Sequence, residues 1–182
     1  ELLGLDSNRV KVDPKATFIL PDDKAEEETT GLVSRIGSTG SGTGAALARR
    51  ISRAAKSGIP LASEHRALRN FLVDTTPILR DLLEQNRRIV IEGTQGFGLS
   101  VLHGGYYPKA TSRGTTAAAF VSEAGLSPLD VDQVVMVIRS FPIRVAENSG
   151  PLPNEITWEE LAKSAGLPKQ YCERTTVTQK VQ

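Results

Sequence analysis

Three segments of this 182-residue chain combine glycine with hydroxyl or amide side chains in patterns suited to binding an oxyanion. The first loop, 38–44, reads STGSGTG and leads into helix-forming residues from Ala45. Glycines let backbone amides approach an anion, hydroxyls add donors, and a helix start carries partial positive charge. The loop therefore predicts a phosphate site that includes Ser38 and Thr39, although a linker or structural turn has the same composition. It is neither a Walker loop nor a dinucleotide fingerprint, since no Lys-Ser/Thr pair follows it and no apolar strand directly precedes it.

The second loop, 93–105, follows an apolar run at 89–91, where open α/β sheets place their ligand crevices. Its Gln95 carries a side-chain amide that can both donate to and accept from a base or carbonyl, or can serve a turn. The third loop, 109–116 (KATSRGTT), has four hydroxyls and two cations beside a predicted helix start, which also suits a phosphate. Three such loops in one small protein favour a shared ligand.

Arg49, Arg50 and Arg53 lie on the predicted helix after the first loop. They are interpreted either as a solvated basic face or as groups that neutralise phosphate charge. No pair of carboxylates and no cluster of metal ligands has a convincing spacing, and no Ser/His/Asp set can be assembled. The sequence therefore favours nucleotide binding over hydrolysis.

The elements that must position these loops alternate between strands and helices. Apolar runs predict strands at 16–20, ended by Pro21, and at 89–91 and 134–138. The last two runs do not alternate, so we expect them to be parallel strands buried on both faces. Helices are predicted at 45–56 with Gly58 as cap, at 64–86 with a bend at Pro77, at 115–125, and at 157–165 with a Thr157–Glu160 capping box. This order predicts an α/β fold with a mostly parallel central sheet and flanking helices.

Composition sets wider bounds. With 22 Lys or Arg and 21 Asp or Glu, the formal charge is +1, which excludes nucleic-acid binding by a basic arm. Hydrophobic residues make up 39%, enough for one core, so residues 1–182 are expected to form a single α/β segment. The single Cys172 and the lack of a long apolar stretch favour a reducing, cytoplasmic setting without membrane contact. Both ends look cut, so a piece of a longer enzyme is expected.

Several of these motifs together resemble a known family. They are 35–44 (RIGSTGSGTG), 91–99 (IEGTQGFGL), 103–108 (HGGYYP), 111–116 (TSRGTT) and 140–145. In this order they resemble the central portion of adenylosuccinate synthetase. The segment 175–179 (TTVTQ) resembles the aspartate-binding loop of the shorter, archaeal-like or phage-like branch of that family.

The resemblance implies a P-loop-NTPase-like α/β fold, here partial, and a Mg²⁺-dependent reaction. GTP phosphorylates the 6-oxygen of IMP, and aspartate then displaces the phosphate to form adenylosuccinate, on the route to AMP. By position, Thr39 and Thr111 would bind the IMP phosphate, Gln95 the base and Val145 the ribose, while Leu99 would line the pocket. Thr176, Thr178 and Lys180 would belong to the aspartate-binding loop.

The resemblance also implies a homodimer in which Arg53 reaches the nucleotide phosphate of the neighbouring subunit. The chain departs from the family pattern at Ser41, Leu102 and Lys180. The family's N-terminal phosphate loop, its catalytic aspartate and histidine, and its C-terminal guanine-binding part have no counterpart in these residues. Catalytic residues are therefore expected upstream of Glu1, and the segment alone is expected to be inactive. Two alternatives stay open: a phage-type ligase that joins aspartate to dGMP, with GTP or ATP as donor, and a non-catalytic nucleotide-binding or scaffold protein.

Overall fold

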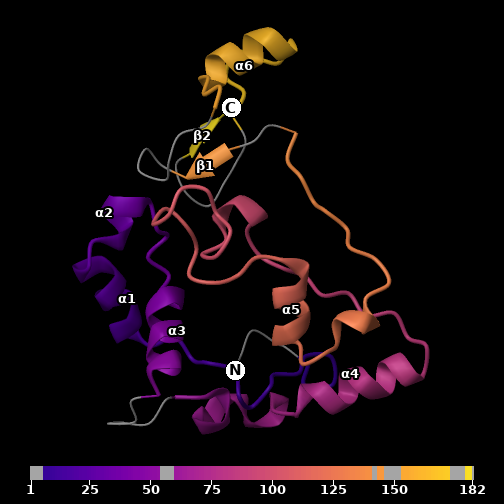
Figure 1. Cartoon of the computed structure of the whole chain (residues 1–182). Helices are drawn as coiled ribbons and strands as arrows, with labels where there is room; N and C mark the ends of the chain where they lie inside the picture. The colour runs from indigo at the N-terminus through magenta and orange to yellow at the C-terminus, as the bar shows by residue number, and fades with distance from the viewer. Residues whose placement is uncertain (1–5, 54–59, 141–142, 146–152, 173–178, 182) are drawn as a thin grey trace.

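The computed structural model of the chain (Figure 1) describes residues 6–53, 60–140, 143–145, 153–172 and 179–181. The helices are α1 Pro21–Thr29, α2 Leu32–Ile36, α3 Thr43–Ser52, α4 Thr75–Glu84, α5 Ala117–Glu123 and α6 Trp158–Ala165. Short 3-10 turns are η1 Ala62–Glu64, η2 Arg66–Phe71, η3 Phe97–Leu99 and η4 Pro128–Asp130, and the strands are β1 Ile143–Val145 and β2 Gln179–Val181. No helix in these ranges is long and apolar enough to cross a membrane.

Helix α1 lies against α3 and begins directly after the segment 16–20, where a strand was expected (Figure 1). In that segment only Thr17 makes a sheet-like bridge, antiparallel to Leu61, so the strand prediction is wrong. Pro21 opens α1 instead of closing a strand, because the first position of a helix needs no amide donor. The extended residues before Pro21 therefore serve as the lead into a helix.

Helix α3 confirms the predicted helix after the first loop, with different ends. It begins at Thr43 and stops at Arg53, whose backbone is left-handed with φ of 53°. The predicted cap at Gly58 lies outside the described residues. The helix is short because a non-glycine residue has already taken the left-handed conformation that ends it.

Two helical stretches form within 64–86 as predicted, but the break between them is not at Pro77. Pro77 is the third residue of α4, where its missing amide costs no helical hydrogen bond. The break falls after η2, where the backbone of Val73 donates to Val12 at 3.1 Å. Asp13 then accepts hydrogen bonds from the Thr75 amide at 3.2 Å and hydroxyl at 2.9 Å, which fixes the start of α4.

The two apolar runs predicted to be buried strands are extended but form no strand. Val90 is 83% exposed and Val137 is 93% exposed, so the prediction of burial at 89–91 and 134–138 is wrong. Figure 1 shows the segment after η4 as a long extended trace on the outside of the chain. An apolar run is buried only where other elements cover it, and the described residues leave most of these two runs exposed. The one sheet among the described residues is antiparallel, with β1 pairing β2.

The remaining two helices confirm the predictions at 115–125 and 157–165, and the second begins at the predicted capping box. The Thr116 hydroxyl accepts from the Ala119 amide at 3.3 Å at the start of α5. At the start of α6, the Thr157 amide donates to Glu160 at 2.7 Å, and the Glu160 amide donates to the Thr157 hydroxyl at 3.1 Å. The Thr157 hydroxyl donates to the same Glu160 carboxylate at 2.9 Å, and the amide and hydroxyl of Thr157 together lower the pKa of that carboxyl. The capping box therefore marks the start of α6.

Candidate functional site

The first loop is held to α1 by a buried carboxylate. The Glu27 side chain accepts hydrogen bonds from the backbone amides of Gly42 at 2.9 Å, Gly44 at 2.8 Å and Ala45 at 3.3 Å. Glu27 is only 3% exposed. These amides are among the donors that the sequence assigned to a phosphate, and they already bind an anion supplied by the chain itself.

The second and third loops are joined by backbone hydrogen bonds. The Thr111 amide donates to the Leu99 carbonyl at 2.7 Å, and the Val101 amide donates to the Arg113 carbonyl at 3.1 Å. The buried Thr115 hydroxyl donates to the carbonyl of Gly96 at 2.8 Å. The structure therefore brings Leu99 and Thr111 together, as expected for two residues of one site.

The first and third loops meet at Gly44. A Cβ atom built on Gly44 would lie 3.4 Å from the Ser112 Cβ and 3.1 Å from a Glu27 carboxylate oxygen. The start of α3 is thus placed between α1 and the third loop, and a larger residue at Gly44 would need its neighbours to shift slightly. All three loops predicted from the sequence are neighbours in the fold, because the third loop contacts both of the others.

Two predicted site residues, Thr39 and Gln95, are not tied to the other loops by their side chains. The Ser38 hydroxyl accepts from the Gly40 amide at 3.2 Å within the first loop, and Thr39 is exposed. Gln95 is exposed on a left-handed backbone with φ of 65°. Within the described residues, no hydrogen bond joins the side chain of Thr39 or Gln95 to the rest of the site. Their roles stay predictions.

The segments predicted for the ribose and for aspartate lie side by side. Strand β1 pairs antiparallel with β2, so that Val145 is opposite Gln179 and Arg144 is opposite Lys180. Thr176 and Thr178 lie outside the described residues. The pairing brings the backbone of Lys180, at the end of the predicted aspartate loop, next to the strand that carries Val145.

The structure gives different surroundings to Arg49 and Arg50 of α3 and to Arg53, the residue that follows it. Arg49 donates to both carboxylate oxygens of Asp23, at 3.0 and 2.7 Å, and to the Phe18 carbonyl at 3.0 Å. Arg50 binds the Lys15 carbonyl and the Thr17 hydroxyl. Arg53 makes no hydrogen bond or ion pair with the described residues and is exposed. Of the three, only Arg53 is available to a phosphate.

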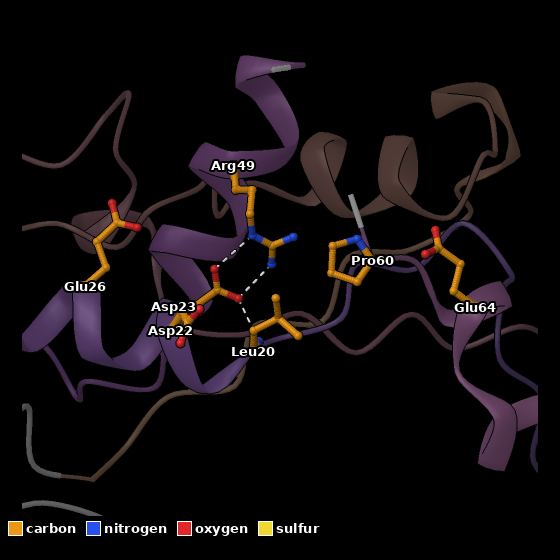
Figure 2. Close-up of a pocket in the computed structure, with 7 residues that line it drawn as sticks. All are labelled: Leu20, Asp22, Asp23, Glu26, Arg49, Pro60 and Glu64. Carbon is orange, nitrogen blue, oxygen red and sulfur yellow. Dashed lines mark hydrogen bonds and ion pairs between the residues drawn. The ribbon is translucent and has the colours of Figure 1, made fainter. Parts of the chain in front are cut away.

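The Asp23–Arg49 pair borders a pocket of about 370 Å³ (Figure 2). Figure 2 shows the guanidinium of Arg49 held by the Asp23 carboxylate beside Leu20, and the pocket is lined by Leu20, Asp22, Asp23, Glu26, Arg49, Pro60 and Glu64. Hydrogen bonds from Arg49 lower the pKa of Asp23, outweighing burial, and the Leu20 amide adds to the effect. Four carboxyl groups against one paired arginine make this pocket unsuited to a phosphate.

Two acidic residues of α1 that position the site were not found from the sequence. Asp23 and Glu27 both face α3, one through Arg49 and the other through the first loop. Their spacing of four places both carboxylates on one face of a helix, which was the available signal. The signal is weak because Glu27 lies in the acidic run AEEET, which resembles an ordinary solvated helix surface.

The comparison with known families matches the part of the chain that holds the second and third loops. The family model described as adenylosuccinate synthetase matches residues 60–181. The chain belongs to the adenylosuccinate synthetase family. Its relatives are synthetases, so membership supports a ligase-type, synthetase-like function in purine biosynthesis.

Archaeal enzymes are among the most similar curated relatives. The adenylosuccinate synthetase of Thermococcus onnurineus is 42% identical over 162 residues, covering 88% of this chain and 45% of the relative. That of Archaeoglobus fulgidus is 38% identical over 164 residues, covering 90% of this chain and 46% of the relative. The chain spans about half the length of the curated relatives it matches.

Two solved structures share the fold. The succinoaminodeoxyadenylate synthetase of cyanophage S-2L, bound to dGMP and dATP as an energy donor, is 33% identical with a TM-score of 0.69. The match covers 93% of the present chain and 50% of the cyanophage protein. The fully ligated adenylosuccinate synthetase of Plasmodium falciparum is 22% identical with a TM-score of 0.76, over 96% of this chain and 50% of its own. These similarities confirm the predicted α/β fold class, although the central sheet is not formed among the described residues.

Proposed function

We propose that this chain is the nucleotide-binding portion of a ligase that joins aspartate to the purine 6-position of IMP, with GTP hydrolysis. The observation that carries the proposal is the contact of the third loop with both others, through Gly44–Ser112 and Leu99–Thr111. A phosphoryl group passes from GTP to the 6-oxygen of IMP. The aspartate amine then attacks C6 of the purine, and the phosphorylated oxygen leaves as phosphate. Residues 1–182 act as one segment of that enzyme, in the cytoplasm.

Each proposed contact uses the chemistry of its loop. Ser38, Thr39 and Thr111 offer hydroxyls to the phosphate of the monophosphate, and Gln95 offers its side-chain amide to the base. Leu99 supplies an apolar wall, and Val145 flanks the ribose. The pairing of β1 with β2 supports this arrangement, because aspartate must reach the base that is attached to that ribose.

Arg53 is proposed to complete the site of a second subunit. It ends α3 in a left-handed conformation, is exposed, and is the arginine of α3 that no described residue binds. An outward-facing guanidinium suits a phosphate presented by another copy of the chain. The proposed assembly is a homodimer.

Mg²⁺ is proposed as cofactor on family membership. The described residues include no group of three or more His, Cys, Asp or Glu side chains that could hold a metal ion. No step of the proposal is routed through the ion.

A second candidate substrate is dGMP. It is supported by the similarity to the cyanophage synthetase, which was solved with dGMP and dATP. In that case ATP replaces GTP as the phosphoryl donor, and aspartate is joined to a 2-aminopurine. The two candidates share the phosphate-binding loops and differ at the base.

A substrate panel on the full-length protein tests both candidates. IMP or dGMP is combined with aspartate and either GTP or ATP, and the succinylated product is measured by chromatography. Product from IMP with GTP supports the first candidate, and product from dGMP supports the second. Binding without product would favour the third alternative, a non-catalytic nucleotide-binding or scaffold protein. No calorimetric binding of any purine monophosphate would overturn the proposal.

A further inference from the structure

The start of α3 carries an anion that belongs to the chain. The first amides of a helix have no partner inside it and attract negative charge. Here the Glu27 carboxylate reaches from α1 and accepts from Gly42, Gly44 and Ala45. It is almost fully buried, so the contact is part of the packing between α1 and α3.

This contact limits where a phosphate can bind. The three amides donate to Glu27 and cannot also donate to a ligand along the same direction. A phosphate at the same place would also be repelled by the carboxylate at short range. The donors left in the first loop lie upstream, around Thr39 and Ser41, whose hydroxyl is 3.0 Å from that of Thr43.

The loop backbone that Glu27 binds is closely surrounded by other residues. Gly42 is left-handed with φ of 80°, and a Cβ there would lie 3.0 Å from both Ile19 and Lys24 side chains. Gly44 is confined between Glu27 and Ser112 of the third loop. Displacing Glu27 would therefore disturb the first loop and its contact with the third.

We infer that Glu27 is the positioning residue of the phosphate-binding loop: it occupies the α3 amides itself and so fixes the upstream residues 38–41 as the phosphate-binding part. This inference rests on the proposed function. Glu27 does not touch the nucleotide. Its role is to hold the first loop in the conformation in which the Thr39 and Ser41 donors face the ligand.

The test compares Glu27→Gln with Glu28→Gln, a matched change one residue along α1 at an exposed position. In the full-length protein, calorimetry gives the affinity for IMP and dGMP and for the corresponding nucleosides, which lack the phosphate. Glu27→Gln is expected to weaken monophosphate binding at least tenfold and to leave nucleoside binding within twofold. Glu28→Gln is expected to change neither. Restoration of most of the affinity by Glu27→Asp would support the role of the charge.

The sign of the effect decides between two models of the loop. If the phosphate uses these amides, Glu27→Gln removes the competing negative charge and one of its two acceptor oxygens, and the variant would bind the monophosphates as tightly as wild type or more tightly. That result overturns the inference while the proposed function stands. If the wild type binds no monophosphate, the proposed function fails and the inference fails with it.

Folding is checked by amide hydrogen exchange at Gly42, Gly44 and Ala45. Faster exchange at these amides in Glu27→Gln, with unchanged exchange in α6, shows that the substitution acts on the first loop alone. If Glu27→Gln unfolds globally, the same affinities are measured for the milder variant Glu27→Asp. Unchanged exchange in both variants would contradict the proposed role.

Discussion

The amide of Thr111 donates to the carbonyl oxygen of Leu99 at 2.7 Å, so two residues twelve positions apart share one corner of the fold. The bond uses backbone atoms only, and it holds whatever side chains the two loops present. It places the third loop against the second, while Ser112 places it against Gly44 of the first. The predictions below follow from this shared corner and from the contacts that support it.

Arg53→Ala is expected to weaken binding of the nucleotide monophosphate by about 1.5 to 3 kcal/mol, the usual value for a hydrogen bond to a charged group. Stability should change little because the Arg53 side chain binds no described residue. Calorimetry on the full-length dimer measures the affinity, with Arg66→Ala as an exposed control. Wild-type affinity in a verified dimer would remove Arg53 from the site.

Mixing two impaired variants, at a substrate concentration where each has little activity, tests whether Arg53 acts across the subunit interface. A heterodimer of Arg53→Ala and Gln95→Gly subunits would contain one site with both residues intact. An equal mixture is therefore expected to recover about a quarter of wild-type activity, since half of the dimers are mixed and each has one good site. If Arg53 acts within its own subunit, the mixture stays as inactive as its components.

Gln95→Gly separates the role of the side chain from that of the backbone. Glycine relieves the left-handed backbone strain at this position, which stabilises the folded chain by about 1 kcal/mol. Glycine also makes the unfolded chain more flexible, which lowers the stability by about 0.4 to 1 kcal/mol, so the two effects nearly cancel. Stability is therefore expected to stay near wild type while turnover falls. Parallel loss of melting temperature and activity would instead assign Gln95 a structural role.

Gly104 and Gly105 form a matched pair within the second loop. A Cβ on Gly104 would lie 2.7 Å from the Ser100 carbonyl oxygen and 2.8 Å from that of Gly98, whereas Gly105 has no neighbouring atom within 4 Å. Gly104→Ala is expected to cost about 1 to 3 kcal/mol because the backbone must shift. Urea unfolding checks this, and Gly105→Ala should be neutral or slightly stabilising. Equal effects of the two changes would contradict the packing described for Gly104.

Asp23→Asn is expected to destabilise the chain by about 3 kcal/mol, near the low end for breaking a buried ion pair. The low end applies because the Arg49 side chain is 25% exposed, while that of Asp23 is 4% exposed. Chemical denaturation at neutral pH measures the loss. Adding Arg49→Met to Asp23→Asn should recover part of it, since no unpaired guanidinium is then left buried.

The same pair predicts how stability depends on pH. Arg49 lowers the pKa of Asp23 in the folded chain below its ordinary value of 3.8. The stabilisation is therefore fully present above pH 3.8 and is lost as the pH falls through the lowered, folded-state pKa. The difference in unfolding free energy between wild type and Asp23→Asn should narrow below pH 3.8, and a constant difference would contradict the ion pair.

Local sequence signals predicted the helices well. The capping residues Thr116 and Thr157 start α5 and α6, because a hydroxyl that binds a helix amide acts over three residues and needs no tertiary partner. The strands at 89–91 and 134–138 were not predicted correctly as buried elements. An apolar run states only that burial is favourable, and burial also requires partners, which the described residues do not supply.

The sequence by itself determined the three loops, the family to which they belong and the residues with chemistry suited to a nucleotide. Only the tertiary structure decided which donors are free. It paired Arg49 with Asp23 and left Arg53 exposed, and it filled the α3 amides with Glu27 from another helix. Residue types and spacing fix what a side chain can do, but distant segments compete for the same donors, and that competition is settled by which elements pack together.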